Sequence, residues 1–292
     1  MWRKSPVPFL KGKRPLVMAH RGDSANTPEN SLRAYEDAYK LKVDVIETDL
    51  RITRDDEIVF FHDARVDRTT NGKGTVKSLT LRELKKLDMG YRFKGVGELE
   101  GSYPFRGKGL QIQTLEEVLT RFPDMKFNMD IKDTLSRAPA VLARKIKELN
   151  AEDRVMIGSF HHKQLKGFRL QSGAPTSASP QEVWKFKRGV YRWFKKNKPF
   201  TFSDDLVLEQ EEVVGEPLPY FALQIPEKIF GMRIFYGPEF FKLCHLVEIA
   251  VHIWRVNEHG DMFRLLDWAV DSIFSDKPKM LLDIVNFKFG SK

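Results

Sequence analysis

Short apolar runs alternate with segments of helical spacing along nearly the whole chain. The apolar runs have the length of β-strands and cover residues 16–19, 43–50, 58–61, 126–131, 155–159, 251–256 and 272–275. Apolar residues recur with helical periodicity between several of them, in residues 32–41, 115–121, 139–149 and 262–269. Strands that alternate with helices are typical of a parallel β-sheet, because each parallel crossover needs a long connection.

The number of strands and the length of the chain predict a (β/α)8 barrel. A weaker apolar run at 174–178 brings the predicted strands to eight, and 292 residues suit one barrel domain over 1–292 with insertions. Two segments are too long for ordinary loops. Residues 67–111, after the third strand, are rich in glycine and charge, and residues 180–241, after the sixth, are rich in aromatics and lysine. A doubly wound open sheet is the alternative.

Composition restricts the location and the partners of the chain. Cys244 is the only cysteine, so a disulfide framework and a cysteine-rich zinc site are excluded, and we expect a structural free thiol. The first 13 residues lack the apolar core of a secretory signal, and no stretch of about 18 apolar residues occurs. We therefore expect a cytoplasmic protein. The net charge of +9 favours an anionic partner.

Polar side chains gather where several predicted strands end. Alternation along VDVIETDL puts Glu47 and Asp49 on one face, and alternation along FNMDIK puts Asn128, Asp130 and Lys132 together. His20 and His62 follow two other apolar runs. Polar groups at the C-terminal ends of barrel strands mark the catalytic mouth of such a fold.

The gathered residue types point to phosphoester chemistry. Three carboxylates, Glu47, Asp49 and Asp130, would repel one another unless a hard cation such as Mg²⁺ or Ca²⁺ lay between them. Two histidines can divide the roles of general base and general acid, and Arg21 and Lys132 can stabilise a phosphoryl oxygen. Metal-assisted hydrolysis of a phosphoester follows. Taken singly, scattered surface carboxylates and hydrogen-bonded structural histidines are the alternatives.

The ordered motifs resemble the glycerophosphodiester phosphodiesterase family. They cover nearly the whole chain and are HRG at 20, PENS at 28, ETD at 47, HD at 62, RTTNGKG at 68, TLEEVL at 114, NMDIK at 128, WRVN at 254 and IFSDKP at 273. The resemblance implies a (β/α)8 barrel that hydrolyses glycerophosphodiesters to glycerol 3-phosphate and an alcohol. It also implies roles for individual residues: His20 and His62 as the acid/base pair, Glu47, Asp49 and Asp130 as metal ligands, and Arg21 and Lys132 as phosphate contacts.

Three positions near these motifs need comment. The carboxylate on the fourth strand is often glutamate in the family and is the shorter Asp130 here. The residue after Trp254 is often threonine and is Arg255 here; strand alternation predicts that Arg255 points away from Trp254, without a catalytic role. Trp254 itself has two equal interpretations, a packed core aromatic or a wall for the glycerol or acyl part of the substrate.

Residues 182–200 form a predicted basic amphipathic helix. Apolar side chains at 183, 186, 190, 193 and 194 share one side and basic residues supply the rest. An outer barrel helix is the more frequent explanation, and peripheral contact with a membrane is the alternative. With membrane contact, a lysophospholipid becomes a substrate, and apolar residues after this helix could line its acyl slot: Phe221, Leu223, Ile225, Phe230, Phe235 and Phe240.

Two further function classes compete with catalysis. A non-catalytic barrel that binds phospholipid or membrane would use the same basic surface, but it would have no need for the complete set of histidines and carboxylates. Nucleic-acid binding has no motif behind it, because the basic residues are spread along the chain. We therefore expect a small glycerophosphodiester or lysophospholipid as the partner and no nucleic acid.

Overall fold

The parallel strands form a barrel that is nearly closed. The computed structural model describes residues 7–202, 206–234 and 237–290. Seven strands pair side by side in parallel in the order β5-β4-β2-β1-β10-β9-β6. Their bounds are β1 Leu16–His20, β2 Val45–Ile52, β4 Lys126–Ile131, β5 Val155–Gly158, β6 Ala222–Pro226, β9 Ala250–Trp254 and β10 Ser272–Ser275.

A short segment closes the barrel between β5 and β6. Thr176 makes a parallel bridge to Ile157, and Ser177 makes one to Ala222. The weak apolar run at 174–178 thus takes the place of the eighth strand, as predicted. The (β/α)8 architecture is confirmed.

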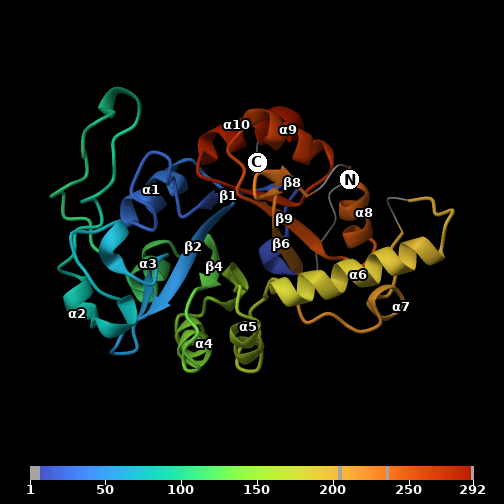
Figure 1. Ribbon diagram of the computed structural model, residues 1–292, viewed down its shortest axis with the longest axis horizontal. Coiled ribbons are helices and arrows are strands. Elements are labelled where there is room, and N and C mark those ends of the chain that lie inside the picture. Colours follow the sequence, from blue (N-terminus) through green and yellow to red (C-terminus); the bar gives the residue numbers. More distant parts are fainter. Residues whose placement is uncertain (1–6, 203–205, 235–236, 291–292) are drawn as a thin grey trace.

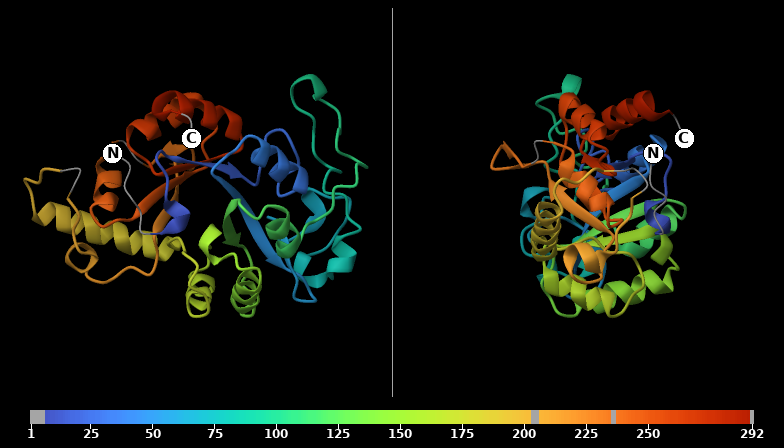
Figure 2. Two further views of the ribbon diagram at one scale, coloured as in Figure 1. Left: turned by 180° about the vertical axis from the view of Figure 1, so that it is seen from behind. Right: turned by 90° about the vertical axis from the view of Figure 1, so that its right-hand side faces the viewer.

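Helices surround the strands, as Figure 1 shows. They are α1 Leu32–Lys40, α2 Leu81–Leu84, α3 Leu115–Arg121, α4 Ala138–Glu148, α5 His162–Arg169, α6 Pro180–Lys196, α7 Gln210–Val214, α8 Glu239–His245, α9 His259–Asp267 and α10 Pro278–Phe289. Residues 67–111 with α2 project on one side of the barrel, and the C-terminal part of α6 projects on the opposite side, in both the front and the rear views (Figures 1 and 2). Within the described part of the chain, no helix is long and apolar enough to cross a bilayer.

The third predicted strand is not part of the parallel barrel. β3, Ile58–Phe60, pairs antiparallel with β2. Only five residues, 53–57, separate the two strands, and a parallel crossover needs a dozen or more. The hairpin extends β2 beyond the barrel and brings the chain back to its rim.

The predicted insertion at 180–241 contains a barrel strand, so its boundaries are wrong. β6 pairs with β9 over five residues, Ala222 to Pro226. α6 packs outside the barrel as a barrel helix does, with Phe186 and Val190 buried. The sequence concealed β6 because Gln224 and Pro226 break its short apolar run. A second hairpin follows, formed by β7 Lys228–Ile229 and β8 Met232–Arg233.

Separate apolar clusters fill the fold. The barrel interior is small and holds Phe9, Met18, Val45, Met156 and Phe274 among others. The large cluster lies between strands and helices and includes the free, buried Cys244, as expected for a structural thiol. The 67–111 insertion has its own cluster around Val76, Leu84 and Met89, which packs on β3 through Val59.

A buried histidine on β9 makes stability depend on pH. His252 is fully buried, and neither ring nitrogen has a hydrogen-bond partner among the described residues. Burial lowers the pKa of His252 to about 4, although the charge of Asp271 acts to raise it. The unfolded chain, with a histidine pKa near 6.5, therefore binds more protons between these values.

Above pH 6.5 His252 is neutral in both states, so it does not lower the free energy of unfolding. As the pH drops towards 4, the unfolded chain takes up a proton at this histidine and the free energy of unfolding should fall by about 3 kcal/mol. Urea unfolding of the wild type and of His252→Leu at pH 7 and pH 4.5 tests this expectation. The variant should lose less stability on acidification than the wild type. Equal losses in both proteins would show that His252 does not carry the effect.

Candidate active site

The polar strand ends meet at the C-terminal rim of the barrel. β1 ends at His20, β2 carries Glu47 and Asp49, and β4 carries Asp130 with Lys132 just beyond it. Asp49 is the register partner of Asp130 on the neighbouring strand. The predicted convergence of these side chains is therefore confirmed by the topology of the barrel.

A compact network of charges lies at the centre of this rim. Lys132 Nζ lies 3.0 Å from Asp49 Oδ1 and 2.5 Å from Asp130 Oδ2. Arg21 Nε forms an ion pair with Asp49 Oδ2 at 3.1 Å, and the backbone N–H of Arg21 donates to Glu47 Oε2 at 3.1 Å. Arg21 and Lys132 thus balance two of the three buried carboxylates.

Two cations do not neutralise three buried carboxylates, and the pKa values of the carboxyl groups reflect this. Burial raises the pKa of Glu47 to about 7, against the opposing charge of His20. Burial also raises the pKa of Asp130, although Lys132 acts against it. Burial acts in the same direction on Asp49, but Lys132 and Arg21 outweigh it and lower the pKa of Asp49 to about 2.

His20 is oriented by a carboxylate that comes directly after the last strand of the barrel. Its Nδ1 lies 2.6 Å from Asp276 Oδ1, and its Nε2 lies 3.9 Å from Glu47 Oε2. Ser24 Oγ and Asn257 Nδ2 also donate to Asp276, at 3.1 and 2.6 Å. Burial acts to raise the pKa of Asp276, but its hydrogen bond with His20 and the other partners lower it to about 2. An ionised Asp276 fixes the imidazole with Nε2 towards the site.

His62 has an equivalent carboxylate partner. Its Nδ1 lies 2.6 Å from Asp63 Oδ1, and Arg68 Nε donates to Asp63 Oδ2 at 2.6 Å. The guanidinium of Arg51 donates to the backbone carbonyl of His62, at 2.7 Å from Nη2. The β2–β3 hairpin brings His62 back to the rim, since the N–H of Phe61 donates to the carbonyl of Asp49.

The loop between β1 and α1 supports the site from one side. Asn30 Nδ2 donates to Asp49 Oδ2 at 2.9 Å, and Glu29 accepts from Arg21 Nη1 at 2.9 Å. Ser31 caps α1 by accepting from the N–H of Ala34. A side chain at Gly22, whose φ is 84°, would lie 2.7 Å from the backbone of Ala34, so this tight turn needs glycine.

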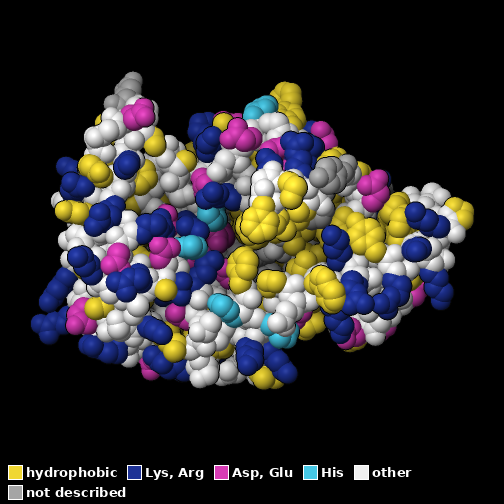
Figure 3. Space-filling view, in the orientation of Figure 1, with side chains coloured by type: hydrophobic (Ala, Val, Ile, Leu, Met, Phe, Trp, Pro, Cys, Tyr) yellow, Lys and Arg dark blue, Asp and Glu magenta, His cyan; other side chains and the backbone are white. Residues whose placement is uncertain are grey.

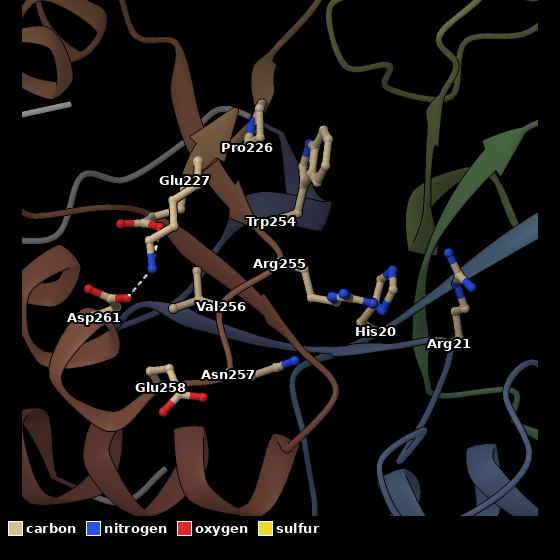
Figure 4. A pocket seen from close by; sticks show the side chains of 11 residues that line it. His20, Arg21, Pro226, Glu227, Trp254, Arg255, Val256, Asn257, Glu258 and Asp261 are labelled. Atoms are coloured by element: carbon tan, nitrogen blue, oxygen red, sulfur yellow. Dashed lines mark hydrogen bonds and ion pairs between the residues drawn. The ribbon is translucent and has the colours of Figure 1, made fainter. Parts of the chain in front are cut away.

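Two adjoining pockets open at the charged centre. The larger, of about 600 Å³, contains His20, His62, Asp130 and Lys132 at one end. Its remaining walls are mostly apolar and come from α6, β6, the β7–β8 hairpin and α8: Val183, Trp184, Ile225, Ile229, Ile234 and Phe240. The smaller, of about 390 Å³, is more polar and holds Glu227, Asn257 and Asp261 (Figure 4).

Trp254 stands between the two pockets and lines both. Its ring contacts Phe160 edge to face, with centroids 5.8 Å apart. Figure 4 shows Trp254 and His20 on adjacent walls of the smaller pocket. Trp254 is therefore a wall of both pockets and not a fully buried core aromatic.

Several neighbours of the site escaped the sequence analysis. Four residues lie within the quoted motifs but had no expected role, yet they hold the two histidines and Arg21: Asp276, Asp63, Glu29 and Arg68. Arg255 had no expected role in the site, but its Nε lies 3.3 Å from Asp276 Oδ2 and it lines the smaller pocket. β9 ends at Trp254, so strand alternation does not extend to Arg255.

The three carboxylates have the oxygen ligands that a hard cation prefers, but in this structure Lys132 lies between two of them. Glu47, Asp49 and Asp130 offer only oxygen ligands, and Asp130 Oδ1 is buried without a hydrogen-bond partner among the described residues. The ammonium of Lys132 lies between Asp49 and Asp130, and the described residues hold no group of three or more such side chains arranged around one point. A cation held by these carboxylates would compete with Lys132 Nζ for Asp49 and Asp130.

Comparison with known proteins agrees with this geometry. The sequence profile of the "Glycerophosphoryl diester phosphodiesterase family" matches residues 20–280. A glycerophosphodiester phosphodiesterase of Caldanaerobacter subterraneus is 34% identical over 92% of this chain and 97% of its own length. One from Bacillus subtilis is 32% identical over 93% of this chain and 87% of its own length.

Solved structures share the fold. A putative glycerophosphoryl diester phosphodiesterase from Silicibacter pomeroyi superposes with a TM-score of 0.72 at 19% identity, over 97% of this chain and 98% of its own. A phosphodiesterase of Oleispira antarctica, in complex with the product sn-glycerol-3-phosphate, superposes with a TM-score of 0.67 at 21% identity, over 94% and 97%. By its sequence match and its relatives, the chain belongs to the glycerophosphoryl diester phosphodiesterase family.

Proposed function

We propose that the chain hydrolyses glycerophosphodiesters to glycerol 3-phosphate and an alcohol, and that its substrates include lysophospholipids. The observation that carries the proposal is the pair of carboxylate-held histidines, His20 and His62, which line one pocket with Arg21 and Lys132. Family membership supports the same enzyme class. The Oleispira antarctica structure, named as a complex with the product sn-glycerol-3-phosphate, fits this choice of product.

The two imidazoles supply general base and general acid. Each is bonded through Nδ1 to an aspartate, Asp276 or Asp63, so each can present Nε2 to the substrate. One accepts a proton from water or from the glycerol 2-hydroxyl of the substrate, and the other protonates the leaving alcohol. Attack by the internal hydroxyl would give a cyclic phosphodiester first. The two imidazoles are held alike, so the geometry allows either assignment of roles.

Arg21 and Lys132 are the phosphate-binding groups in this proposal. Both line the larger pocket and both are fixed by buried carboxylates. Opposing charges raise the pKa of Lys132 above its ordinary value despite its burial, so its ammonium stays charged. Fixed cations of this kind stabilise the charge that grows on the phosphoryl oxygens in the transition state.

Glu47, Asp49 and Asp130 are the proposed ligands of Mg²⁺ or Ca²⁺. A bound cation would polarise the phosphoryl group. Treatment with EDTA is expected to reduce hydrolysis to background, and either cation should restore it. The rate of release of glycerol 3-phosphate measures both steps. Full activity in excess chelator would exclude a cation role for these three side chains.

The apolar end of the larger pocket is the proposed acyl site. A lysophospholipid carries a glycerophosphodiester headgroup next to one acyl chain, and the pocket joins the charged centre to walls such as Val183, Ile225 and Phe240. Of the residues predicted for such a slot, Ile225 and Phe240 line this pocket, whereas Phe221, Leu223 and Phe230 do not. Phe235 lies outside the described residues. Burial of the chain would add affinity in proportion to the apolar area removed from water.

A substrate panel tests the breadth of the activity. Glycerophosphocholine, glycerophosphoethanolamine and lysophosphatidylcholine are compared, with glycerol 3-phosphate or lysophosphatidic acid as the measured product. The lysophospholipid should show a lower KM than the soluble diesters, by about tenfold or more. If the chain hydrolyses the soluble diesters but not the lysophospholipid, the proposed acyl site is refuted. Binding of lipid without hydrolysis of any diester would support the non-catalytic alternative.

Peripheral membrane contact was the alternative interpretation of residues 182–200, beside that of an outer barrel helix. Most of the apolar side of α6 packs on the barrel through Phe186 and Val190, so that side is occupied. The side chains of α6 left for a lipid surface are basic ones together with Trp184 and Tyr191, which are exposed. Membrane contact through α6 alone would therefore be mainly electrostatic.

A further inference from the structure

The β7–β8 hairpin presents apolar side chains to solvent beside the mouth of the larger pocket. Phe230 is 97% exposed and Met232 67%. Ile229, 45% exposed, also lines the pocket, so apolar surface continues from the hairpin into the site. Exposed apolar surface that continues into a binding site marks a place of interaction.

The turn of this hairpin is an unusual place for phenylalanine. Phe230 and Gly231 form a two-residue loop between the paired Ile229 and Met232, with φ values of 50° and 79°. Such turns favour asparagine, aspartate or glycine, because a positive φ is unfavourable for a bulky side chain. The almost complete exposure of the ring means that packing within the chain does not compensate for this backbone conformation.

Ion pairs hold the hairpin against α9. Asp261 accepts from Lys228 Nζ at 2.8 Å and from Arg233 Nη2 at 2.6 Å. Glu227 accepts from Arg264 Nη2 at 2.5 Å. Glu227 and Asp261, both labelled in Figure 4, lie on either side of the ammonium of Lys228, which is 3.3 Å from Glu227 Oε2 and 2.8 Å from Asp261 Oδ2. The hairpin is therefore held at its base and its tip protrudes from the protein. A protrusion of this kind can insert into a lipid layer.

Other exposed aromatics and cations lie around the same mouth. Trp184 is 61% and Phe160 56% exposed, and both line the pocket together with Lys187. The guanidinium of Arg188 lies 4.4 Å from the centre of the Trp184 ring. In Figure 3 hydrophobic side chains gather around the central hollow, and lysines and arginines continue along α6. Aromatic and cationic groups of this kind fit an anionic lipid interface.

We propose that the chain docks on an anionic lipid surface through the β7–β8 hairpin, with Phe230 and Met232 inserted in the interfacial layer. The basic side chains of α6 would lie against the headgroups, and the mouth of the pocket would face the lipid. The net charge of +9 favours such a surface over a neutral one. The inference rests on the proposed function for its purpose, but docking can be measured without turnover.

Vesicle sedimentation tests the docking surface. The variant Phe230→Asn/Met232→Thr removes both apolar side chains and keeps residues suited to the turn and the strand. The matched control is Leu170→Asn, since Leu170 is 79% exposed and follows α5, at the opposite end of the barrel from the mouth. All three proteins are mixed with phosphatidylcholine vesicles, with and without phosphatidylglycerol, at low and high salt.

The wild type and the control should bind the anionic vesicles, and the affinity of the double variant should be lower by about tenfold or more. High salt should weaken all binding. Hydrolysis of soluble glycerophosphocholine should be equal in all three, because neither Phe230 nor Met232 lines a pocket of the site. If the wild type does not hydrolyse glycerophosphocholine at all, the proposed function is refuted, but the vesicle-binding result still stands.

Three results would overturn the docking surface. The wild type could fail to sediment with anionic vesicles, or the double variant could sediment as the wild type does. The wild type could also be a dimer that the double variant dissociates, as size-exclusion chromatography would show. The hairpin would then bind a second copy of the chain.

Discussion

Replacement of His20 or of His62 by alanine is expected to lower kcat for glycerophosphocholine by about 10²- to 10⁴-fold. Each imidazole is held through Nδ1 by an aspartate, and each carries one of the two proton transfers in the proposed reaction. KM should change much less than kcat, because Arg21 and Lys132 still bind the phosphate. The measurement is the steady-state release of glycerol 3-phosphate.

Folding and position are controlled separately. His161→Ala removes an exposed imidazole just before α5 and should leave the rate unchanged. Circular dichroism of both catalytic variants should match the wild type, since His20 and His62 are not part of an apolar cluster. Their urea midpoints should fall only modestly, because Asp276 keeps Ser24 and Asn257 as partners and Asp63 keeps Arg68. Near wild-type turnover in either variant would remove the acid/base mechanism.

Replacement of Lys132 by methionine is expected to affect both stability and rate. The ammonium lies 3.0 Å from Asp49 and 2.5 Å from Asp130, and both carboxylates are buried. Loss of one partner from a buried ion pair costs about 3–5 kcal/mol. Loss of a fixed cation at the phosphoryl group costs roughly 10²- to 10³-fold in kcat.

The pH and cation dependence of Lys132→Met distinguish a specific effect from a general one. Without Lys132 the pKa of Asp49 and that of Asp130 should rise, so the stability deficit should be largest near pH 7 and should shrink as the carboxylates take up protons. Ca²⁺ or Mg²⁺ should raise the urea midpoint of this variant more than that of the wild type. The control Lys163→Met changes an exposed lysine of α5. Wild-type stability and rate in Lys132→Met would contradict the assigned network.

The barrel was predictable because periodicity is a local property of the sequence. The runs at 16–19, 126–131 and 272–275 became β1, β4 and β10 almost unchanged. Strand alternation also placed Glu47 and Asp49 on the face that meets Asp130, as the register of β2 and β4 confirms. β6 escaped because a short strand with Gln224 and Pro226 has no distinct periodic pattern.

The support of the histidines was not predictable in the same way. Asp276 is 256 residues away from His20 in the sequence, and the two meet only because β10 closes the barrel against β1. Arg68 comes from the insertion and reaches Asp63 and Glu29 across the rim. Such contacts depend on three-dimensional closure. The resemblance to a family indicated the acids and bases, and the structure adds the groups that orient them.

The central claim is that the two carboxylate-held imidazoles at the rim carry out phosphodiester hydrolysis. The most direct test incubates the purified chain with glycerophosphocholine and a divalent cation and quantifies glycerol 3-phosphate and choline together. The account predicts both products in equal amounts from the wild type, and neither above background from His20→Ala/His62→Ala. Bound but unhydrolysed diester with the wild type, or equal product from the double variant, would contradict it.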